Sequence, residues 1–251
     1  MLIACWSPKG GSGTTVIACG LAAVLARSAP PDVLSSPQPH RSPQHMAPHV
    51  DRHGVVIADL AGDVPAVLGL PEPSGPGLAE WLEAGPDVTA SALARLEIDA
   101  VPRLRLLPWS AGSGRGAAAA PGRAEALLEA LSDDARPVVA DCGTAADGPG
   151  LALAAGAPVS LLVLRPCYLG LRRALAAPVR PSGVILLTEQ GRSLARRDVE
   201  DVLGVPVRAE VAIDEAVARA VDAGLLARRI PRPLERALRS AVGVSAGRDA
   251  A

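Results

Sequence analysis

A glycine-rich heptapeptide near the start of the chain carries the clearest chemistry in this sequence. It reads KGGSGTT, and it lies between the apolar run LIACW and a segment with helical apolar period. In a strand-loop-helix arrangement, backbone N–H groups of such a loop form an anion nest at the positive end of the helix dipole. Thr15 stands where a phosphate-loop hydroxyl meets Mg²⁺, and Thr14 replaces the usual lysine. The predicted phosphate site consists of Lys9, Gly10, Gly11, Ser12, Gly13, Thr14 and Thr15.

The only lysine of the chain, Lys9, lies at the mouth of this loop, and every other basic side chain except histidine is an arginine. A compact ammonium group reaches a phosphate where a planar guanidinium does not fit. A dinucleotide-binding loop is the weaker interpretation, because Val16 stands where the third glycine of that motif belongs. Lys9 is therefore a candidate phosphate ligand.

Strand-length apolar runs alternate with helix-period segments, which is typical of repeated βα units. We expect a single-domain α/β fold with a mostly parallel twisted sheet and helices on both faces. Strands are predicted at Leu2–Trp6, Val55–Asp59, Leu104–Pro108, Val138–Asp141, Val159–Leu164, Val184–Leu187 and Val205–Val211. Helices are predicted at Thr14–Arg27, Leu78–Ala84, Ala90–Leu96, Arg123–Leu131, Leu169–Ala177, Arg196–Leu203, Glu215–Ala223 and Leu234–Val242.

The composition fits such a sheet, because 49% of the 251 residues are apolar and Phe is absent, which leaves an aliphatic core. A formal net charge of −1 gives no whole-molecule attraction to nucleic acid or to an anionic membrane. No apolar run approaches the roughly 18 to 20 residues of a membrane helix, and the N-terminus is predicted to be a strand rather than a signal peptide. We expect a cytoplasmic protein with four reduced cysteines.

A segment rich in Pro, Ser and His, at about residues 28–53, separates the first predicted helix from the second strand. It has little to bury and is predicted to be an exposed insertion. His45, His49 and His53 are four residues apart and could bind a metal from one helix, but Pro43 and Pro48 oppose that helix. Residues 243–251 are predicted to be a disordered tail.

The motif SPKGGSGTT resembles the deviant Walker A motif of the MinD/ParA group of P-loop ATPases. The resemblance implies a P-loop NTPase fold, ATP or ADP with Mg²⁺ as cofactors, and a nucleotide-dependent homodimer in which Lys9 acts on the partner's nucleotide. PVVADCG is similar to the Walker B strand, which implies that Asp141 holds a Mg²⁺-bound water and Thr15 the ion itself. Asp59, in VVIADLAGDVPAVLGL, is implied as a further catalytic or metal residue.

This match covers residues 1 to about 242 without the insertion. GDVPAVLGL is similar to the CpaE/TadZ branch, which is associated with Flp-type pili, and to related septum-site-like proteins. The resemblance therefore implies a partner in a pilus-assembly or division machine, and recruitment from the cytoplasm to a pole, a septum or the inner membrane face.

Three positions depart from the family's pattern. Thr14 removes a charge-assisted phosphate contact worth on the order of 1.5 to 3 kcal/mol, or roughly ten- to a hundredfold in affinity. Ala61 stands where a second aspartate would position the attacking water, and phosphoryl transfer depends on such positioning. Thr188 replaces an asparagine that reads adenine. We expect modest nucleotide binding and an ATPase that is weak at most.

Three functional interpretations follow. One is a dimerising nucleotide switch that positions another machine, and the second is a pseudo-ATPase scaffold that works through protein contacts alone. The third is DNA or membrane contact through the arginines between Arg228 and Arg239. It is less favoured, since the apolar residues of that segment have spacing that suits packing on the sheet.

Overall fold

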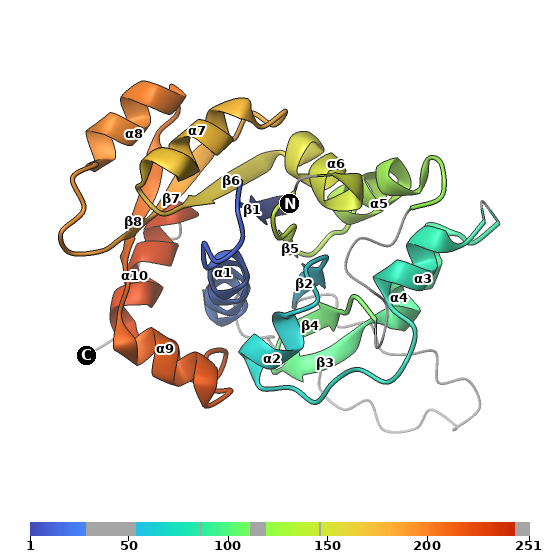
Figure 1. Cartoon of the computed structure of the whole chain (residues 1–251). Helices are drawn as coiled ribbons and strands as arrows, with labels where there is room; N and C mark the ends of the chain where they lie inside the picture. Colours follow the sequence, from blue (N-terminus) through green and yellow to red (C-terminus); the bar gives the residue numbers. More distant parts are fainter. Residues whose placement is uncertain (29–53, 86, 111–118, 146, 244–251) are drawn as a thin grey trace.

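The computed structural model describes residues 1–28, 54–85, 87–110, 119–145 and 147–243. These contain an eight-stranded sheet in the order β3-β4-β2-β5-β1-β6-β7-β8, and its neighbouring strands are parallel except for the antiparallel pair β3 and β4 (Figure 1). The strands are β1 (Leu2–Trp6), β2 (Val55–Asp59), β3 (Ile98–Val101), β4 (Leu104–Leu107), β5 (Val138–Asp141), β6 (Val159–Leu164), β7 (Gly183–Thr188) and β8 (Val207–Ala212). The predicted single α/β domain with a mostly parallel sheet is confirmed.

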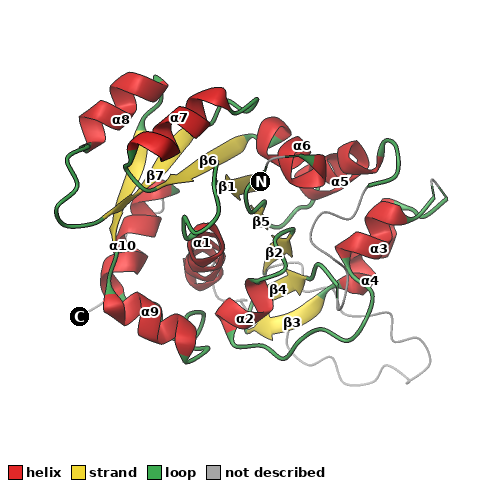
Figure 2. Ribbon diagram, in the orientation of Figure 1, coloured by secondary structure: helices red, strands yellow, loops and turns green. Residues whose placement is uncertain are grey.

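Helices cover both faces of the sheet, as Figure 2 shows. Side chains alternate along β1, so Ile3 and Cys5 enter one apolar core and Leu2, Ala4 and Trp6 enter the other. The first core is closed by α1 (Thr14–Ser28), α2 (Val64–Leu68), α9 (Glu215–Asp222) and α10 (Arg232–Ala241). The second is closed by α3 (Leu78–Glu83), α4 (Leu93–Leu96), α5 (Arg123–Ser132), α6 (Gly148–Gly156), α7 (Tyr168–Ala176) and α8 (Arg196–Leu203).

The predicted strands agree with the structure best in the centre of the sheet, where β1, β2, β5 and β6 begin and end at the predicted residues. Five strand ends differ from the prediction by one or two residues, and two of them involve a proline. β4 stops before Pro108 and β8 starts after Pro206, because proline has no N–H to donate to a ladder. Predicted helix ends differ from the observed ones by at most two residues, and the segment predicted as one helix from Ala90 begins as a 3₁₀ turn, Ala90–Ala92.

Three short or unusual elements were not predicted: α2, α6 and β3. The insertion with its four histidines and the predicted tail fall on residues 29–53 and 244–251, outside the described residues. Cys5, Cys19 and Cys142 are buried and unoxidised, as expected, and burial raises the pKa of each thiol.

The apolar side of the basic C-terminal segment packs onto α1. Leu234 and Leu238 of α10 are buried in the first core. Gly20 of α1 permits this contact, because a Cβ there would lie 2.6 Å from Leu238 Cδ1. The apolar face of α10 is therefore used within the fold, while Arg232 and Arg236 are exposed on the same helix.

Within the described ranges, no helix is both long enough and apolar enough to cross a membrane.

Candidate nucleotide-binding site

The glycine-rich loop joins the carboxyl end of β1 to α1 in the middle of the sheet. Its neighbours β5 and β6 lie on either side of β1, so the loop occupies the point where the chain switches from one half of the sheet to the other. Crevices at such switch points are the usual ligand sites of open α/β sheets. The strand-loop-helix arrangement predicted for residues 2–27 is thus present.

The loop is held in shape by its own hydroxyl groups. The Ser7 and Ser12 hydroxyls each donate a hydrogen bond to the Lys9 carbonyl at 2.9 Å, and Ser7 N–H donates to the Gly143 carbonyl at 2.9 Å. Gly11 and Gly13 have φ values of 72° and 76°, which favour glycine. These hydrogen bonds and the two left-handed glycines fix the backbone of the loop, which is the kind of turn that forms anion nests.

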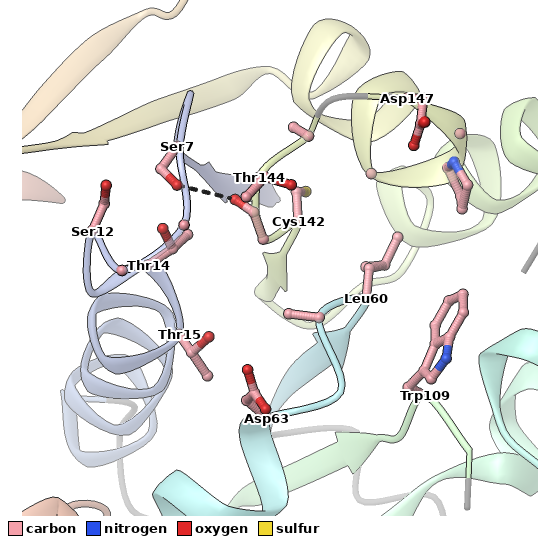
Figure 3. A pocket seen from close by; sticks show the side chains of 18 of the residues that line it. Ser7, Ser12, Thr14, Thr15, Leu60, Asp63, Trp109, Cys142, Thr144 and Asp147 are labelled. Carbon is pink, nitrogen blue, oxygen red and sulfur yellow. Dashed lines mark hydrogen bonds between the residues drawn. The ribbon is translucent and has the colours of Figure 1, made fainter. Parts of the chain in front are cut away.

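The loop forms one wall of a cavity of about 840 Å³ (Figure 3). Every predicted loop residue from Gly10 to Thr15 lines it, whereas Lys9 does not. The other walls include Leu60, Asp63 and Trp109. Among the described residues that line the cavity there are two carboxylates, Asp63 and Asp147, but no lysine or arginine.

Asp141 lies under the cavity at the end of β5. Its side chain is fully buried, Oδ1 accepts a hydrogen bond from Gly143 N–H at 3.2 Å, and Oδ2 has no partner among the described residues. Burial raises the pKa of Asp141 to about 6, and a hydrogen bond from the Thr15 hydroxyl opposes that rise. The structure thus brings the two predicted metal residues into contact and leaves one carboxylate oxygen unsatisfied.

Asp59 is the neighbour of Asp141 in the parallel pairing of β2 with β5. Its Oδ1 accepts hydrogen bonds from the N–H groups of Ala61 (3.0 Å) and Gly62 (2.6 Å), and its Oδ2 accepts one from Val64 (3.1 Å). Burial, and secondarily the charge of Asp141, raises the pKa of Asp59 to about 7. The observed contacts of Asp59 shape the turn at residues 59–64, and Asp59 does not line the cavity. Its predicted catalytic or metal role remains a prediction.

Asp63 is the residue that the sequence reasoning passed over. Ala61, at the position where the family's second aspartate was expected, presents only a methyl group close to Gly143. Two residues later, Asp63 points into the cavity from the start of α2, while Thr15 points in from α1 (Figure 3). The charge of Asp63 also contributes to raising the pKa of Asp141. The sequence feature that could have pointed to Asp63 is the Gly-Asp pair shortly after the end of β2.

Trp109 closes the far side of the cavity. It directly follows Pro108 at the end of β4, is 5% exposed, and its indole N–H has no hydrogen-bond partner among the described residues. Its Cδ1 would lie 3.9 Å from a Cβ at Gly62, so the indole borders the turn at residues 59–64. No motif in the sequence marked this residue. Thr188, the predicted base reader, ends β7 and does not line this cavity.

The sequence matches no family profile and no curated protein. Solved structures do match it. A ParA family ATPase from Chlorobium tepidum has a TM-score of 0.71 at 20% identity, covering 94% of this chain and 95% of that one. The septum site-determining protein MinD from Pyrococcus horikoshii, in complex with Mg-ADP, has a TM-score of 0.71 at 16% identity, covering 96% and 93%.

The chain has the fold of the ParA and MinD ATPases. An ATP complex of a McdA variant from Cyanothece shares the ParA/MinD fold with this chain at a TM-score of 0.66 and 19% identity, covering 98% and 96%. The predicted P-loop NTPase fold is thus confirmed. In the described part of the chain, no group of three His, Cys, Asp or Glu side chains could chelate a metal ion.

Proposed function

We propose that this protein is a nucleotide-dependent positioning protein of the MinD/ParA family. It binds ATP or ADP with Mg²⁺ in the cavity above Asp141, and its ATP-bound form dimerises. One observation carries the proposal: the glycine-rich loop lines the cavity, and its Thr15 interacts with Asp141, which retains an unsatisfied carboxylate oxygen. A protein that used this fold without binding nucleotide would not need a hydroxyl group beside an unsatisfied carboxylate oxygen at this place.

The residues of the site fit the nucleotide and the ion. Backbone N–H groups from Gly10 to Thr15 would hold the phosphates, and the Thr15 hydroxyl would bind Mg²⁺. Asp141 Oδ2 would accept a hydrogen bond from a water of the ion, which satisfies its missing partner. Asp59 is a further candidate for the same shell. When bound, Mg²⁺ neutralises negative charge on the phosphates.

Lys9 has a separate role in this proposal. Because no basic side chain of the described residues lines the cavity, phosphate charge must be offset by the loop amides, by Mg²⁺ and by a group from outside. Lys9 is partly exposed and lies outside its own cavity, which suits a lysine that acts on the nucleotide of a second copy. Nucleotide binding and dimerisation would then be coupled.

Hydrolysis in this proposal is weak or absent, since Thr14 and Ala61 lack the groups that neutralise phosphate charge and position water. The protein would position a division or pilus-assembly machine. It would be recruited from the cytoplasm to a pole, a septum or the inner membrane face. Division-site placement is supported by the likeness to septum site-determining MinD. Pilus assembly is supported by the CpaE/TadZ-like segment after β2.

A pseudo-ATPase scaffold is the second candidate. The observation that favours it is the cavity wall itself, where the described lining residues offer two carboxylates and no basic side chain to an anionic ligand. A scaffold would keep the same fold and bind its partner in one fixed state.

Equilibrium binding of ATP and ADP, with and without Mg²⁺, separates the two candidates when light scattering follows mass in the same samples. We expect Mg²⁺-dependent ATP binding and a shift to dimer in the wild type. Lys9→Ala is expected to abolish the dimer shift, and Lys9→Arg serves as the matched control for charge without the compact ammonium. Absence of binding at millimolar nucleotide would contradict the switch and favour the scaffold.

A further inference from the structure

The turn between β2 and α2 places one carboxylate in the cavity that no part of the predicted site uses. Asp63 lines the cavity together with Thr15, and both side chains point into it (Figure 3). The other residues of this turn are Leu60, Ala61 and Gly62, which carry no acidic or hydroxyl group. Asp63 is therefore the acidic side chain that this turn presents to a ligand.

The turn is built to hold Asp63 in that place. Asp59 accepts three backbone hydrogen bonds from Ala61, Gly62 and Val64, which lie on both sides of Asp63. Gly62 has a φ of 81°, a left-handed conformation that favours glycine, and the chain bends there just before Asp63. Because hydrogen bonds fix the turn on both sides of Asp63, they also fix the place of the Asp63 carboxylate.

Asp63 also lies close to the proposed cation position. It lies on the same side of the cavity as Thr15 (Figure 3), and its charge contributes to raising the pKa of Asp141. Mg²⁺ keeps several water ligands in protein sites, and carboxylates commonly accept hydrogen bonds from them.

We propose that Asp63 is a positioning residue that accepts hydrogen bonds from the water shell of Mg²⁺, in place of a carboxylate at position 61. This inference rests on the proposed nucleotide site. In the absence of the ion, Asp63 repels an anionic nucleotide, and in its presence Asp63 stabilises the ion. The same side chain thus makes nucleotide binding more dependent on Mg²⁺.

This dual effect defines the test, which is the affinity for ADP measured across a Mg²⁺ titration and in EDTA. Asp63→Asn is expected to raise the Mg²⁺ concentration for half-maximal binding about tenfold. In EDTA the same variant is expected to bind ADP at least as tightly as the wild type, because a repulsive charge is gone. Asp63→Glu keeps the charge and is expected to retain most of the Mg²⁺ effect.

Asp147→Asn is the matched control, because Asp147 lines the same cavity in the loop before α6 and its replacement removes the same charge. We expect its Mg²⁺ requirement to stay within about twofold of the wild type. Equal Mg²⁺ requirements for Asp63→Asn and Asp147→Asn would overturn the inference. So would parallel losses of binding in EDTA and in Mg²⁺, which mark a structural defect. If wild-type protein binds no nucleotide, the proposed function itself fails.

Discussion

Position 14 shows how one side chain can set the strength of a phosphate site. Thr14 begins α1, is 6% exposed, and lines the cavity. Its hydroxyl group brings no charge to a wall that already lacks basic side chains among the described residues. In the proposed nucleotide complex, the loop amides would therefore hold the phosphates without a basic side chain from the cavity wall.

Thr14→Lys is expected to tighten Mg-ATP binding by roughly ten- to a hundredfold, because it supplies one charge-assisted contact to the phosphates. Thr14→Met is the control of similar length without charge. Isothermal titration calorimetry of both variants measures the effect. Equal affinities for the lysine and methionine variants would show that the anion does not lie against this position.

For individual residues, the sequence pointed to candidate site residues where they belong to a short continuous motif. The loop from Lys9 to Thr15 could be singled out because its glycines and hydroxyls have the spacing of a phosphate loop, whereas Asp141 was assigned through the resemblance of PVVADCG to the Walker B strand. Asp63 and Trp109 could not be assigned in the same way. They reach the cavity only because β2 pairs with β5 and β4 pairs with β2, which is a property of the sheet order.

Helix α2 connects the site to a distant part of the chain. It ends at Gly69, whose φ is 70° and whose hypothetical Cβ would lie 2.2 Å from the Gly224 carbonyl oxygen. Gly224 follows α9, so the backbone of the two segments touches at paired glycines. Helix α2, which begins directly after Asp63, is thus in backbone contact with the segment that follows α9.

Gly69→Ala is expected to lower the free energy of unfolding by about 2 to 4 kcal/mol, because it adds both backbone strain and a clash that side-chain rotation cannot relieve. Gly85→Ala is the control, since a Cβ at Gly85 would meet nothing within 4 Å. Urea denaturation followed by circular dichroism measures both. A change of less than about 0.5 kcal/mol in both variants would contradict the close approach.

The elements missed by sequence reasoning share a physical cause. α2 has five residues and β3 has four, too few for a periodic pattern to stand out. The segment of α6, GPGLALAAG, contains three glycines and a proline and is apolar on all sides, so it has the composition of a loop. Burial against the sheet overrides these local preferences.

The whole molecule buries two carboxylates on adjacent strands, and this gives its stability a pH dependence. Folded Asp59 and Asp141 have pKa values of about 7 and about 6, above the ordinary value of 3.8. The folded state therefore binds more protons than the unfolded state between about pH 4 and pH 7. The stability that this preference contributes is fully present below about pH 4 and is lost as pH rises through the folded pKa values.

We expect the nucleotide-free protein to be less stable at pH 8 than at pH 5 by about 4 kcal/mol from these two groups. Asp141→Asn is expected to reduce that difference, because the amide does not ionise. Asp201→Asn, at an exposed position on α8, should leave it unchanged. Urea midpoints at the two pH values provide the comparison, and an unchanged difference in Asp141→Asn would contradict the assignment.

The chain contains three tryptophans, and their environments differ. The indole N–H of Trp6 donates to the Ser160 hydroxyl at 3.0 Å, and that of Trp81 donates to the Thr89 carbonyl at 3.3 Å. Trp109 alone among them borders the cavity, with its N–H unpaired within the described residues. Because indole fluorescence responds to local polarity, the wall of the cavity carries a built-in optical reporter. Events in the site can thus be followed by emission, without a label and without altering the chain.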